Sequence, residues 1–358
     1  MNLSAHFAQR AFQHQDKDNN WIYSPYSITV ALGISYLGTA GKTRTELEST
    51  LQISEERLPP VLPEAEQETI LSANRLFISD ICTPENDFSI AVEARFQSHP
   101  QLLWMKIPER AAAVINHWVS EETQENIRTV IRPADIDPTH TRLILIAALY
   151  FSGQWRTPFE VERTKDAIFY KNGTEAQPVQ MMTRTDSLQS QLLEDCQLVA
   201  LPYRADVSLF IVLPNASEGW RAIQPEDWER NFEHLQSLPA KKTKISLPRF
   251  SIDTADDISG LLQKMGIVSA FSSQEADFSR ITEEESLQID TVRHQAHLSI
   301  DENGTEAAAA TAVVIARPRS VGLRAEPPLV ITIDHPFFFV LRHNQTKEWL
   351  FVGQYLGV

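Results

Sequence analysis

Residues 303–328 read NGTEAAAATAVVIARPRSVGLRAEPP and are the most unusual stretch of this chain of 358 residues. Every side chain in 304–316 is small or β-branched, with the exception of Glu306. Alanine favours helix, whereas the β-branched residues 313–315 favour strand. In an extended strand, alternate residues of 305–315 would present one face without a charge. Composition therefore allows either a surface helix followed by a proline-limited loop, or a loop that can also become a buried strand.

Composition restricts the class of protein. The net charge is -15 and the pI is near 5.1, so we expect neither nucleic acid nor an anionic membrane surface as a partner. The longest apolar run, 143–151, has the length of a strand and not of a membrane span. Residues 1–12 have helical spacing and no signal-peptide pattern. We therefore expect a cytoplasmic chain, or one exported by an unrecognised route. Cys82 and Cys196 lie in apolar surroundings, which favours buried thiols.

Periodicity and capping signals predict an α+β protein, because helices dominate early and strands dominate late. Ser24 and Pro25 indicate a helix start, and Thr43 with Glu46 has the pattern of a capping box. The run 143–151 is typical of a strand buried on both faces. Further helices are predicted at 115–131 and 257–265, and further strands at 198–203, 208–213, 244–247, 329–333, 337–341 and 349–354.

Several short motifs, taken in order, resemble the serpin family over nearly the whole chain. Each is weak alone, whereas their common order is specific. They are WIYSPYSI at 21–28, INHWV at 115–119, YFSGQW at 150–155, LPY at 201–203, LPRF at 247–250, MGI at 265–267, ADFS at 276–279, DENGTEAAAATA at 301–312 and DHPFFF at 334–339.

The resemblance implies one domain, 1–358, in which helices surround three β-sheets and a reactive-centre loop of about 302–328 is exposed. It also implies a suicide inhibitor. A serine protease cleaves the loop, and the loop then inserts into the large sheet while the protease remains attached. The hinge of the loop would consist of Glu302, Gly304, Thr305, Glu306, Ala307, Ala308, Ala309, Ala310 and Thr311. We expect arginine at position 305 to leave folding intact and to block insertion, because its charge would become buried unpaired.

The resemblance further assigns Ser24, Ser27, Trp155 and His294 to the region where the large sheet opens. The family's usual asparagine partner for the histidine is replaced by Ala147 in this chain. That hydrogen-bond arrangement must therefore be absent or rebuilt.

Three arginines compete as the site of cleavage. Pro318 makes the bond after Arg317 a poor substrate, whereas Arg319 precedes the small Ser320, as in antithrombin-like loops. The bond between Arg324 and Ala325 would require a much longer inserted strand. We predict the Arg319–Ser320 bond, with Arg324–Ala325 as the alternative, and hence a trypsin-like target protease. Arg319 lies one residue farther from the hinge than is usual in the family.

Other functions have less support. The chain lacks a Gly-X-Ser-X-Gly elbow, and His294 and His297 have no third metal ligand in sequence, so we expect neither an enzyme nor a metal or other cofactor. A heparin site would need basic residues along 52–70, where Arg57 is surrounded by glutamates. A non-inhibitory serpin that acts as a binding protein or chaperone is the main alternative. The chain is expected to be a monomer that can polymerise by swapping loops.

Overall fold

The computed structural model describes residues 2–63, 69–305 and 327–357. In this part of the chain, helices and strands both form, which confirms the α+β class. The helices are α1 (Leu3–Phe12), α2 (Pro25–Leu37), α3 (Gly41–Leu51), α4 (Asn86–Phe96), α5 (Pro108–Glu122), α6 (Trp228–Ser237) and α7 (Ser259–Met265). The strands are β1 (Trp21–Tyr23), β2 (Ile70–Ser79), β3 (Gln101–Leu103), β4 (Leu143–Phe151), β5 (Gly153–Gln154), β6 (Lys165–Lys171), β7 (Glu175–Leu192), β8 (Cys196–Pro202), β9 (Val207–Pro214), β10 (Lys241–Pro248), β11 (Phe250–Asp257), β12 (Ile289–Ile300), β13 (Gly304–Thr305), β14 (Leu329–Thr332), β15 (Phe337–His343) and β16 (Trp349–Tyr355).

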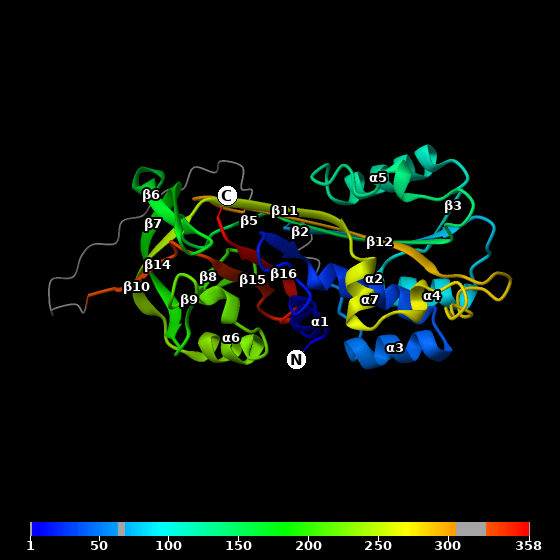
Figure 1. Cartoon of the computed structure of the whole chain (residues 1–358), viewed down its shortest axis with the longest axis horizontal. Coiled ribbons are helices and arrows are strands. Elements are labelled where there is room, and N and C mark those ends of the chain that lie inside the picture. The colour runs from blue at the N-terminus through cyan, green and yellow to red at the C-terminus, as the bar shows by residue number, and fades with distance from the viewer. Residues whose placement is uncertain (1, 64–68, 306–326, 358) are drawn as a thin grey trace.

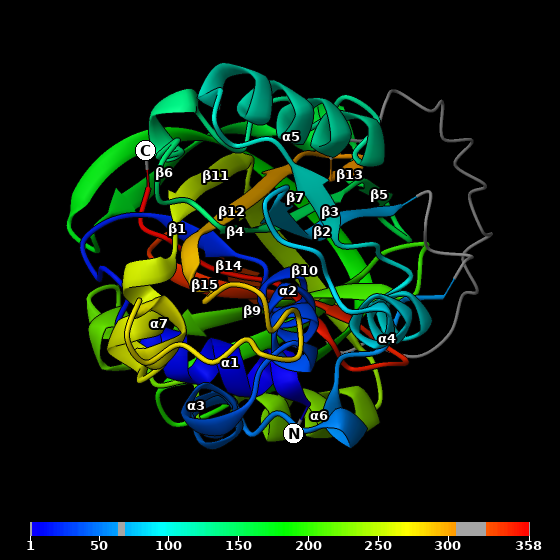
Figure 2. The same ribbon diagram turned by 90° about the vertical axis from the view of Figure 1, so that its right-hand side faces the viewer.

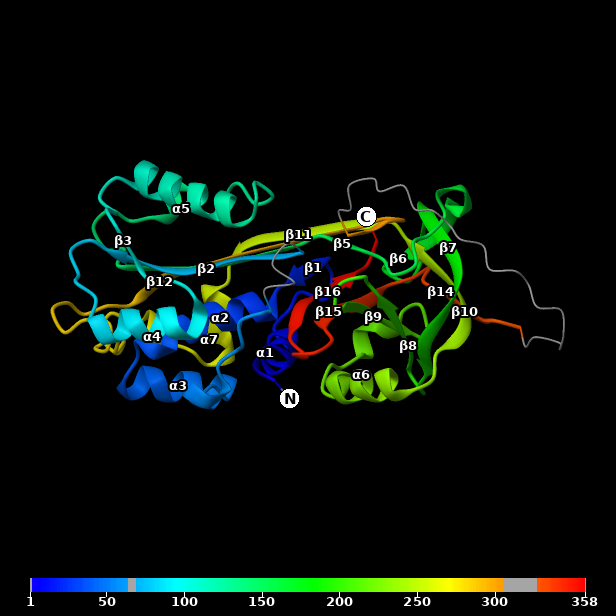
Figure 3. The same cartoon turned by 180° about the vertical axis from the view of Figure 1, so that it is seen from behind.

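The elements are arranged in layers. Helix α5 lies over the outer face of a large sheet, and a second sheet lies on the other side of it (Figures 1 and 2). Helices α1, α3 and α6 form the opposite surface of the molecule (Figure 2). Strands β6, β7, β10 and β14 gather at one end, far from α5 (Figure 3). A contiguous apolar core fills the space between the two sheets, and smaller clusters pack under α5 and under α6.

The large sheet has the strand order β3-β2-β4-β12, with β11 beside β12. Strands β4 and β12 run parallel and pair directly, which places Ala147 opposite His294. At one end of this sheet the path continues through β13 to β5. The start of the predicted hinge, residues 304–305, is therefore attached to the large sheet at the end where β4 and β12 finish.

The second hydrogen-bonded network runs β1-β16-β15-β9-β8-β7-β10-β14. Strand β7 has 18 residues and joins two regions, because its earlier part pairs with β6 and β10 and its last residues pair with β8. Two of the three expected sheets are therefore continuous through β7. The expected serpin-like architecture is otherwise present in the described part of the chain.

Burial of strand β4 on both faces explains why its sequence is apolar throughout. All of its residues are buried. Leu143 and Leu145 belong to the core between the sheets, whereas Ile144 and Ile146 pack in the cluster under α5. Because successive side chains of a strand point to opposite faces, burial of both faces requires an unbroken apolar run. The prediction for 143–151 is confirmed.

Two helix predictions were wrong in detail. The helix expected at 115–131 ends at Glu122, because Gln124 and Glu125 have positive φ values of 50° and 64° and cannot continue it. The capping-box prediction also fails. Helix α3 begins at Gly41, and the Glu46 carboxylate instead accepts hydrogen bonds from the backbone of residues 268–269 in a distant segment. Glu46 therefore makes a tertiary contact and does not cap its own helix.

A buried charge cluster lies where the β15–β16 hairpin meets α6. The Arg342 guanidinium is fully buried and donates to the Glu229 carboxylate. Glu348 is only 2% exposed, and one of its carboxylate oxygens has no hydrogen-bond partner among the described residues. Burial raises the pKa of Glu348 to about 7, and the nearby Glu229 charge adds to this rise, while a Ser4 hydrogen bond opposes it.

The Glu348 carboxyl group predicts a pH-dependent stability. Its folded pKa lies above the ordinary value of 4.5, so the native state holds a proton that the unfolded chain releases, and stability falls as the pH rises from about 4.5 through 7. Glu348→Gln should remove this dependence and raise the unfolding free energy above pH 8 by on the order of 3 kcal/mol. Thermal unfolding at pH 6 and pH 8.5 checks this. Exposed Glu233→Gln serves as the control, and equal shifts in both variants would contradict the assignment.

Candidate functional site

The hinge begins with a tight turn that leads out of β12. The Asp301 carboxylate accepts hydrogen bonds from the amides of Asn303 (2.7 Å) and Gly304 (3.1 Å). Gly304 has φ +152°, and a Cβ atom there would lie 1.9 Å from the carbonyl oxygen of Gly153. Only glycine fits such a close backbone approach. The turn directs the chain into the two-residue strand β13, between the end of β12 and β5.

Glu302 anchors the start of the hinge. Its side chain is 3% exposed and lies 2.6 Å from the Arg249 guanidinium, and the hydroxyl of Thr164 also donates to it. Burial alone would raise the pKa of Glu302, but the hydrogen bonds from Arg249 and Thr164 outweigh burial and hold its pKa below the usual value. The carboxylate is therefore charged and paired. Sequence reasoning placed Glu302 in the hinge but had no signal for Arg249 as its partner.

Thr305 is the last described hinge residue, and it is fully buried. Its hydroxyl forms a 2.7 Å hydrogen bond with that of Tyr203. Tyr203 stacks on Trp155 with ring centroids 4.2 Å apart, and the Trp155 indole donates to the carbonyl of Asp301 at 2.9 Å. Trp155 therefore lies at the end of the large sheet, beside the start of the predicted hinge.

This burial corrects two expectations. The loop was predicted to be exposed from residue 302, but Glu302, Gly304 and Thr305 are buried in the intact chain. Arginine at position 305 was expected to leave folding intact. That expectation was wrong, because the new charge would be buried beside Tyr203 before any cleavage occurs. The remaining predicted hinge residues, Glu306 to Thr311, lie outside the described residues, as do Arg319, Ser320, Arg324 and Ala325.

The sheet-opening region lies on the inner side of β4 and β12. The His294 Nε2 atom accepts a hydrogen bond from the Ser24 amide at 3.1 Å, and Nδ1 donates to the Ala147 carbonyl at 2.7 Å. An amide can only donate and a carbonyl can only accept, so these partners require the neutral ring with its proton on Nδ1. One imidazole therefore links helix α2, strand β12 and strand β4.

The hydrogen-bond arrangement around His294, which we expected to be absent or rebuilt, is rebuilt with other partners. Where the family's asparagine is replaced by Ala147, the backbone carbonyl of that residue accepts a hydrogen bond from His294 Nδ1. An asparagine is nevertheless present on the neighbouring strand: Asn74 lies opposite Ala147 in the register of β2 and β4. Its side-chain oxygen accepts a 2.6 Å hydrogen bond from the hydroxyl of Ser27. Sequence reasoning missed Asn74, because only the sheet register brings it next to Ala147.

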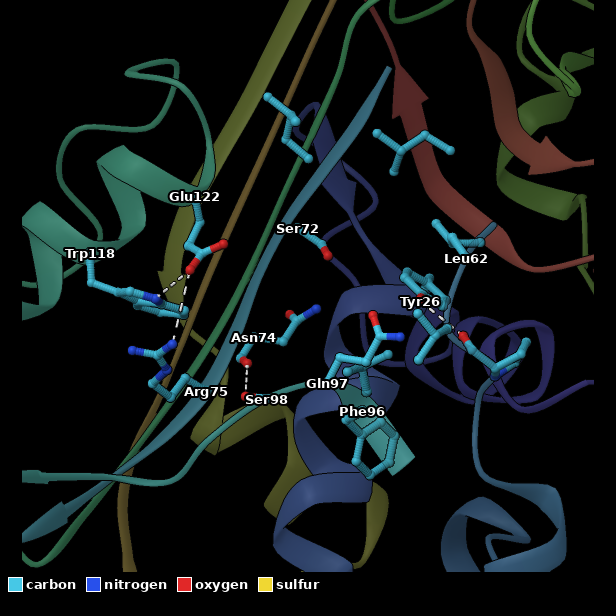
Figure 4. Close-up of a pocket in the computed structure, with 15 residues that line it drawn as sticks. Tyr26, Leu62, Ser72, Asn74, Arg75, Phe96, Gln97, Ser98, Trp118 and Glu122 are labelled. Atoms are coloured by element: carbon cyan, nitrogen blue, oxygen red, sulfur yellow. Dashed lines mark hydrogen bonds and ion pairs between the residues drawn. The ribbon is translucent and has the colours of Figure 1, made fainter. Parts of the chain in front are cut away.

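A cavity of about 290 Å³ lies beside β2, between residues of α2, such as Tyr26, and residues of α5, such as Trp118 (Figure 4). Asn74 lies on its wall, and the Asn74 carbonyl accepts a hydrogen bond from Ser98 at 2.9 Å. Across the cavity, the Trp118 indole donates to Glu122, and the Arg75 guanidinium lies over the Trp118 ring, 4.1 Å from its centroid. These contacts hold the end of α5 against β2.

Arg184 is a further buried group that sequence reasoning missed. It lies on β7 and is 4% exposed, and none of its guanidinium nitrogens has a hydrogen-bond partner in the described part of the chain. The guanidinium carbon is 4.5 Å from the centroid of the Phe159 ring, and Asp186 lies 3.8 Å away. Burial lowers the pKa of Arg184 to about 10, and the Asp186 charge opposes this shift.

Two further properties of the described residues bear on function. His, Cys, Asp and Glu side chains do not gather there in a group of three that could hold a metal ion. In the same residues, none of the helices combines the length and apolarity needed to cross a bilayer. Cys82 and Cys196 are both buried free thiols, as predicted.

Comparison with known proteins agrees with this architecture. The family model described as "Serpin (serine protease inhibitor)" matches residues 2–357. Human Serpin B4 is 30% identical, over 95% of this chain and 94% of its own length. Among solved structures, native protease nexin-1 with heparin superposes with a TM-score of 0.86 at 26% identity, covering 100% of this chain and 98% of that one. Human thyroxine-binding globulin, complexed with thyroxine, superposes with a TM-score of 0.83, also at 26% identity, covering 99% of this chain and 97% of that one.

The layered α+β fold, with residues 304–305 attached to the end of a large mixed sheet, is the architecture of the solved serpins that this chain resembles. The chain belongs to the serpin family, whose members are in general protease inhibitors and not enzymes. Relatives such as thyroxine-binding globulin are named for carrying a ligand.

Replacing the hinge anchor should loosen the start of the hinge. Glu302→Gln removes the charge that pairs with Arg249, and we expect it to lower the unfolding free energy by about 2 kcal/mol. The thermal midpoint and hydrogen exchange of the β13 amides measure the effect. Glu162→Gln, at an exposed site nearby, should change neither quantity. Unchanged exchange in Glu302→Gln would show that the ion pair does not hold the hinge.

The neutral His294 ring predicts a loss of stability in acid. Burial lowers its pKa to about 4 against the opposing effect of the Ala147 carbonyl, so the unfolded chain binds a proton that the native state excludes. The stability that His294 provides is therefore complete above about pH 6.5 and falls as the pH drops towards 4, by on the order of 3 kcal/mol. His294→Gln should flatten this part of the pH–stability profile, measured by thermal unfolding. The exposed His14→Gln control should retain the full slope.

Proposed function

We propose that this serpin is a suicide inhibitor of trypsin-like serine proteases, and that Arg319–Ser320 is the bond they attack. The observation that carries the proposal is the position of β13. The two-residue strand β13, which ends at Thr305, lies beside the end of β12, while β4 and β12 still pair directly with one another. A chain that continued from Thr305 between β4 and β12 would add a strand at the centre of the large sheet.

The composition of the hinge supports the same mechanism. From Thr305 to Ile315 alternate side chains are small or β-branched and uncharged, so one face could be buried in the sheet without an unpaired charge. Burial of Val313 and Ile315 would contribute roughly 1.5–3 kcal/mol each. The 15 steps from Gly304 to Arg319, at about 3.3 Å per residue, carry an attached protease on the order of 50 Å.

For cleavage by the protease, this chain has to supply only the Arg319–Ser320 peptide bond. The hydroxyl oxygen of the protease serine attacks the carbonyl carbon of Arg319 and forms an ester. The bond from that carbon to the nitrogen of Ser320 breaks, and the amine leaves with a proton supplied by the protease. If insertion is faster than the attack of water on the ester, the acyl-enzyme persists. The extra residue before Arg319 adds slack, which should let some encounters end in simple cleavage.

Incubation with trypsin tests the mechanism and the bond together. We expect an SDS-stable complex, and a released C-terminal peptide whose first residue is Ser320. Arg319→Ala should abolish the complex, whereas the matched change Arg324→Ala should leave it. A peptide that begins at Ala325 would reject the Arg319–Ser320 assignment while retaining the inhibitor. The absence of any complex, with both bonds cleaved, would reject the inhibitor itself.

A ligand carrier or chaperone of the same fold is the second candidate. The named ligand of thyroxine-binding globulin favours it, although that ligand belongs to the relative alone. Thermal unfolding before and after cleavage of the loop separates the two functions. A cleaved inhibitor should be much more stable because its loop becomes a strand of the sheet, whereas a carrier without insertion should be unchanged.

For partners, we propose a monomer that engages a protease covalently and does not use heparin. Protease nexin-1 was solved with heparin, but here Arg57 is the basic residue in the described segments 52–63 and 69–70. Loop-swap polymerisation would follow from the same insertion, with the hinge of one molecule entering the sheet of another.

A further inference from the structure

A second cavity, of about 560 Å³, opens between the end of α6 and strands β7, β8 and β9. It is separate from the cavity of Figure 4 and shares no lining residue with it. We call it the arginine pocket, because Arg156 and Arg204 both line it. Its volume lies within the range of pockets that hold small organic ligands, roughly 300–1,000 Å³.

The two arginines are free to bind an anion. Both are exposed, and neither forms an ion pair or a side-chain hydrogen bond within the described residues. The acidic side chain among the lining residues is Asp206, which has an interaction of its own. Two cations at one cavity, in a protein of net charge -15, raise the local positive potential where an anion would bind.

Arg184 places a third positive charge near the pocket, with Asp186 3.8 Å from it. Its buried guanidinium has no hydrogen-bond partner in the described part of the chain. Burial is the main cause that lowers its pKa, and it is also close enough to Arg156 for the repulsion between the two charges to add to that shift. Arg184 does not line the pocket, so it would act through space on a ligand held by Arg156 and Arg204.

The remaining wall of the pocket is mixed. Leu188, Ala200 and Tyr203 contribute apolar atoms to it, and polar side chains such as Ser187 and Gln189 contribute the rest. The Asn344 side chain also lines the pocket; its oxygen accepts a hydrogen bond from Gln236, which leaves its N–H groups as donors without an acceptor in the described residues. A small-molecule site needs a few polar groups that fix the orientation of the ligand, and Arg156, Arg204 and Asn344 could supply them here.

We propose that the arginine pocket binds an organic anion, with its sulfonate, sulfate or carboxylate between Arg156 and Arg204 and its apolar ring against Leu188 and Tyr203. Guanidinium groups bind such oxyanions through paired hydrogen bonds. This proposal does not depend on the inhibitory mechanism, because it concerns binding to the intact chain.

The position of the two arginines connects the pocket to the hinge. Trp155 and Tyr203 form a β-bridge, and Arg156 and Arg204 are the next residue after each of them. Their backbones complete the bridge, since the Arg156 amide donates to Pro202 and the Arg204 amide to the Gln154 carbonyl. An anion shared by both side chains would therefore hold the Trp155–Tyr203 bridge closed. Tyr203 also carries the hydroxyl that bonds Thr305, so the ligand should stabilise the buried start of the hinge.

Calorimetric titration of the intact protein with naphthalene-2-sulfonate tests the site. We expect one molecule bound per chain, and a rise in the thermal midpoint with ligand concentration. The double variant Arg156→Gln/Arg204→Gln should weaken binding at least tenfold. The matched control Arg110→Gln/Arg128→Gln makes the same change of charge at exposed positions on and after α5, and should bind as the unmodified protein does.

Two further arms keep the test decisive. Ala240→Trp, at an exposed position on the wall of the pocket, should block binding while both arginines remain. The neutral analogue naphthalene-2-methanol should bind at least tenfold more weakly than the sulfonate. Equal affinity in the pocket variants, an equal loss in the control variant, or equal binding of the neutral analogue would each overturn the proposal. Unfolding midpoints of the ligand-free variants establish that each one folds.

Discussion

The direct pairing of β4 with β12 leaves the large sheet complete as it stands, although the hinge is already positioned at the end of that same pair of strands. Strands β4 and β12 satisfy their facing backbone hydrogen-bonding groups with one another. A further strand can enter between them only if these hydrogen bonds break and each strand then pairs with the inserted one. The other features described here bear on that exchange. Glu302 and Thr305 hold the hinge at the end of the ladder, and His294 holds its middle.

His294 and Glu302 are held by opposite kinds of physical chemistry. His294 must stay neutral, because a proton on Nε2 would face the Ser24 amide. The hinge instead relies on a charge that must stay ionised, since Glu302 pairs with Arg249. The two groups therefore respond differently to acid and to mutation, although both lie along β12 or at its end. Tyr203 connects this end of the sheet to the arginine pocket, because it lines the pocket and also forms a hydrogen bond with Thr305.

Much of the fold could be predicted from local patterns. The run at 143–151 indicated a strand buried on both faces, and Ser24 with Pro25 indicated the start of α2, as observed. Predictions failed where distant residues intervened. Glu46 has the spacing of a capping residue, yet it binds the backbone of 268–269, and the helix predicted to reach residue 131 ends at 122. Long strands such as β7 and β12 lack a clear local signal, because they change environment along their length.

The amino-acid sequence by itself determined the family, the small side chains of the predicted hinge and the arginines among which we propose the cleavage site. Those properties depend on the composition and the order of the residues, so they can be recognised without knowing which residues are in contact. Only the tertiary structure decided that Thr305 is buried before cleavage, that Asn74 lies beside Ala147, and that Arg249 pairs with Glu302. Each of these depends on sheet register or on chain reversal, which bring together residues far apart in sequence. Such contacts leave no periodic trace in the order of residues.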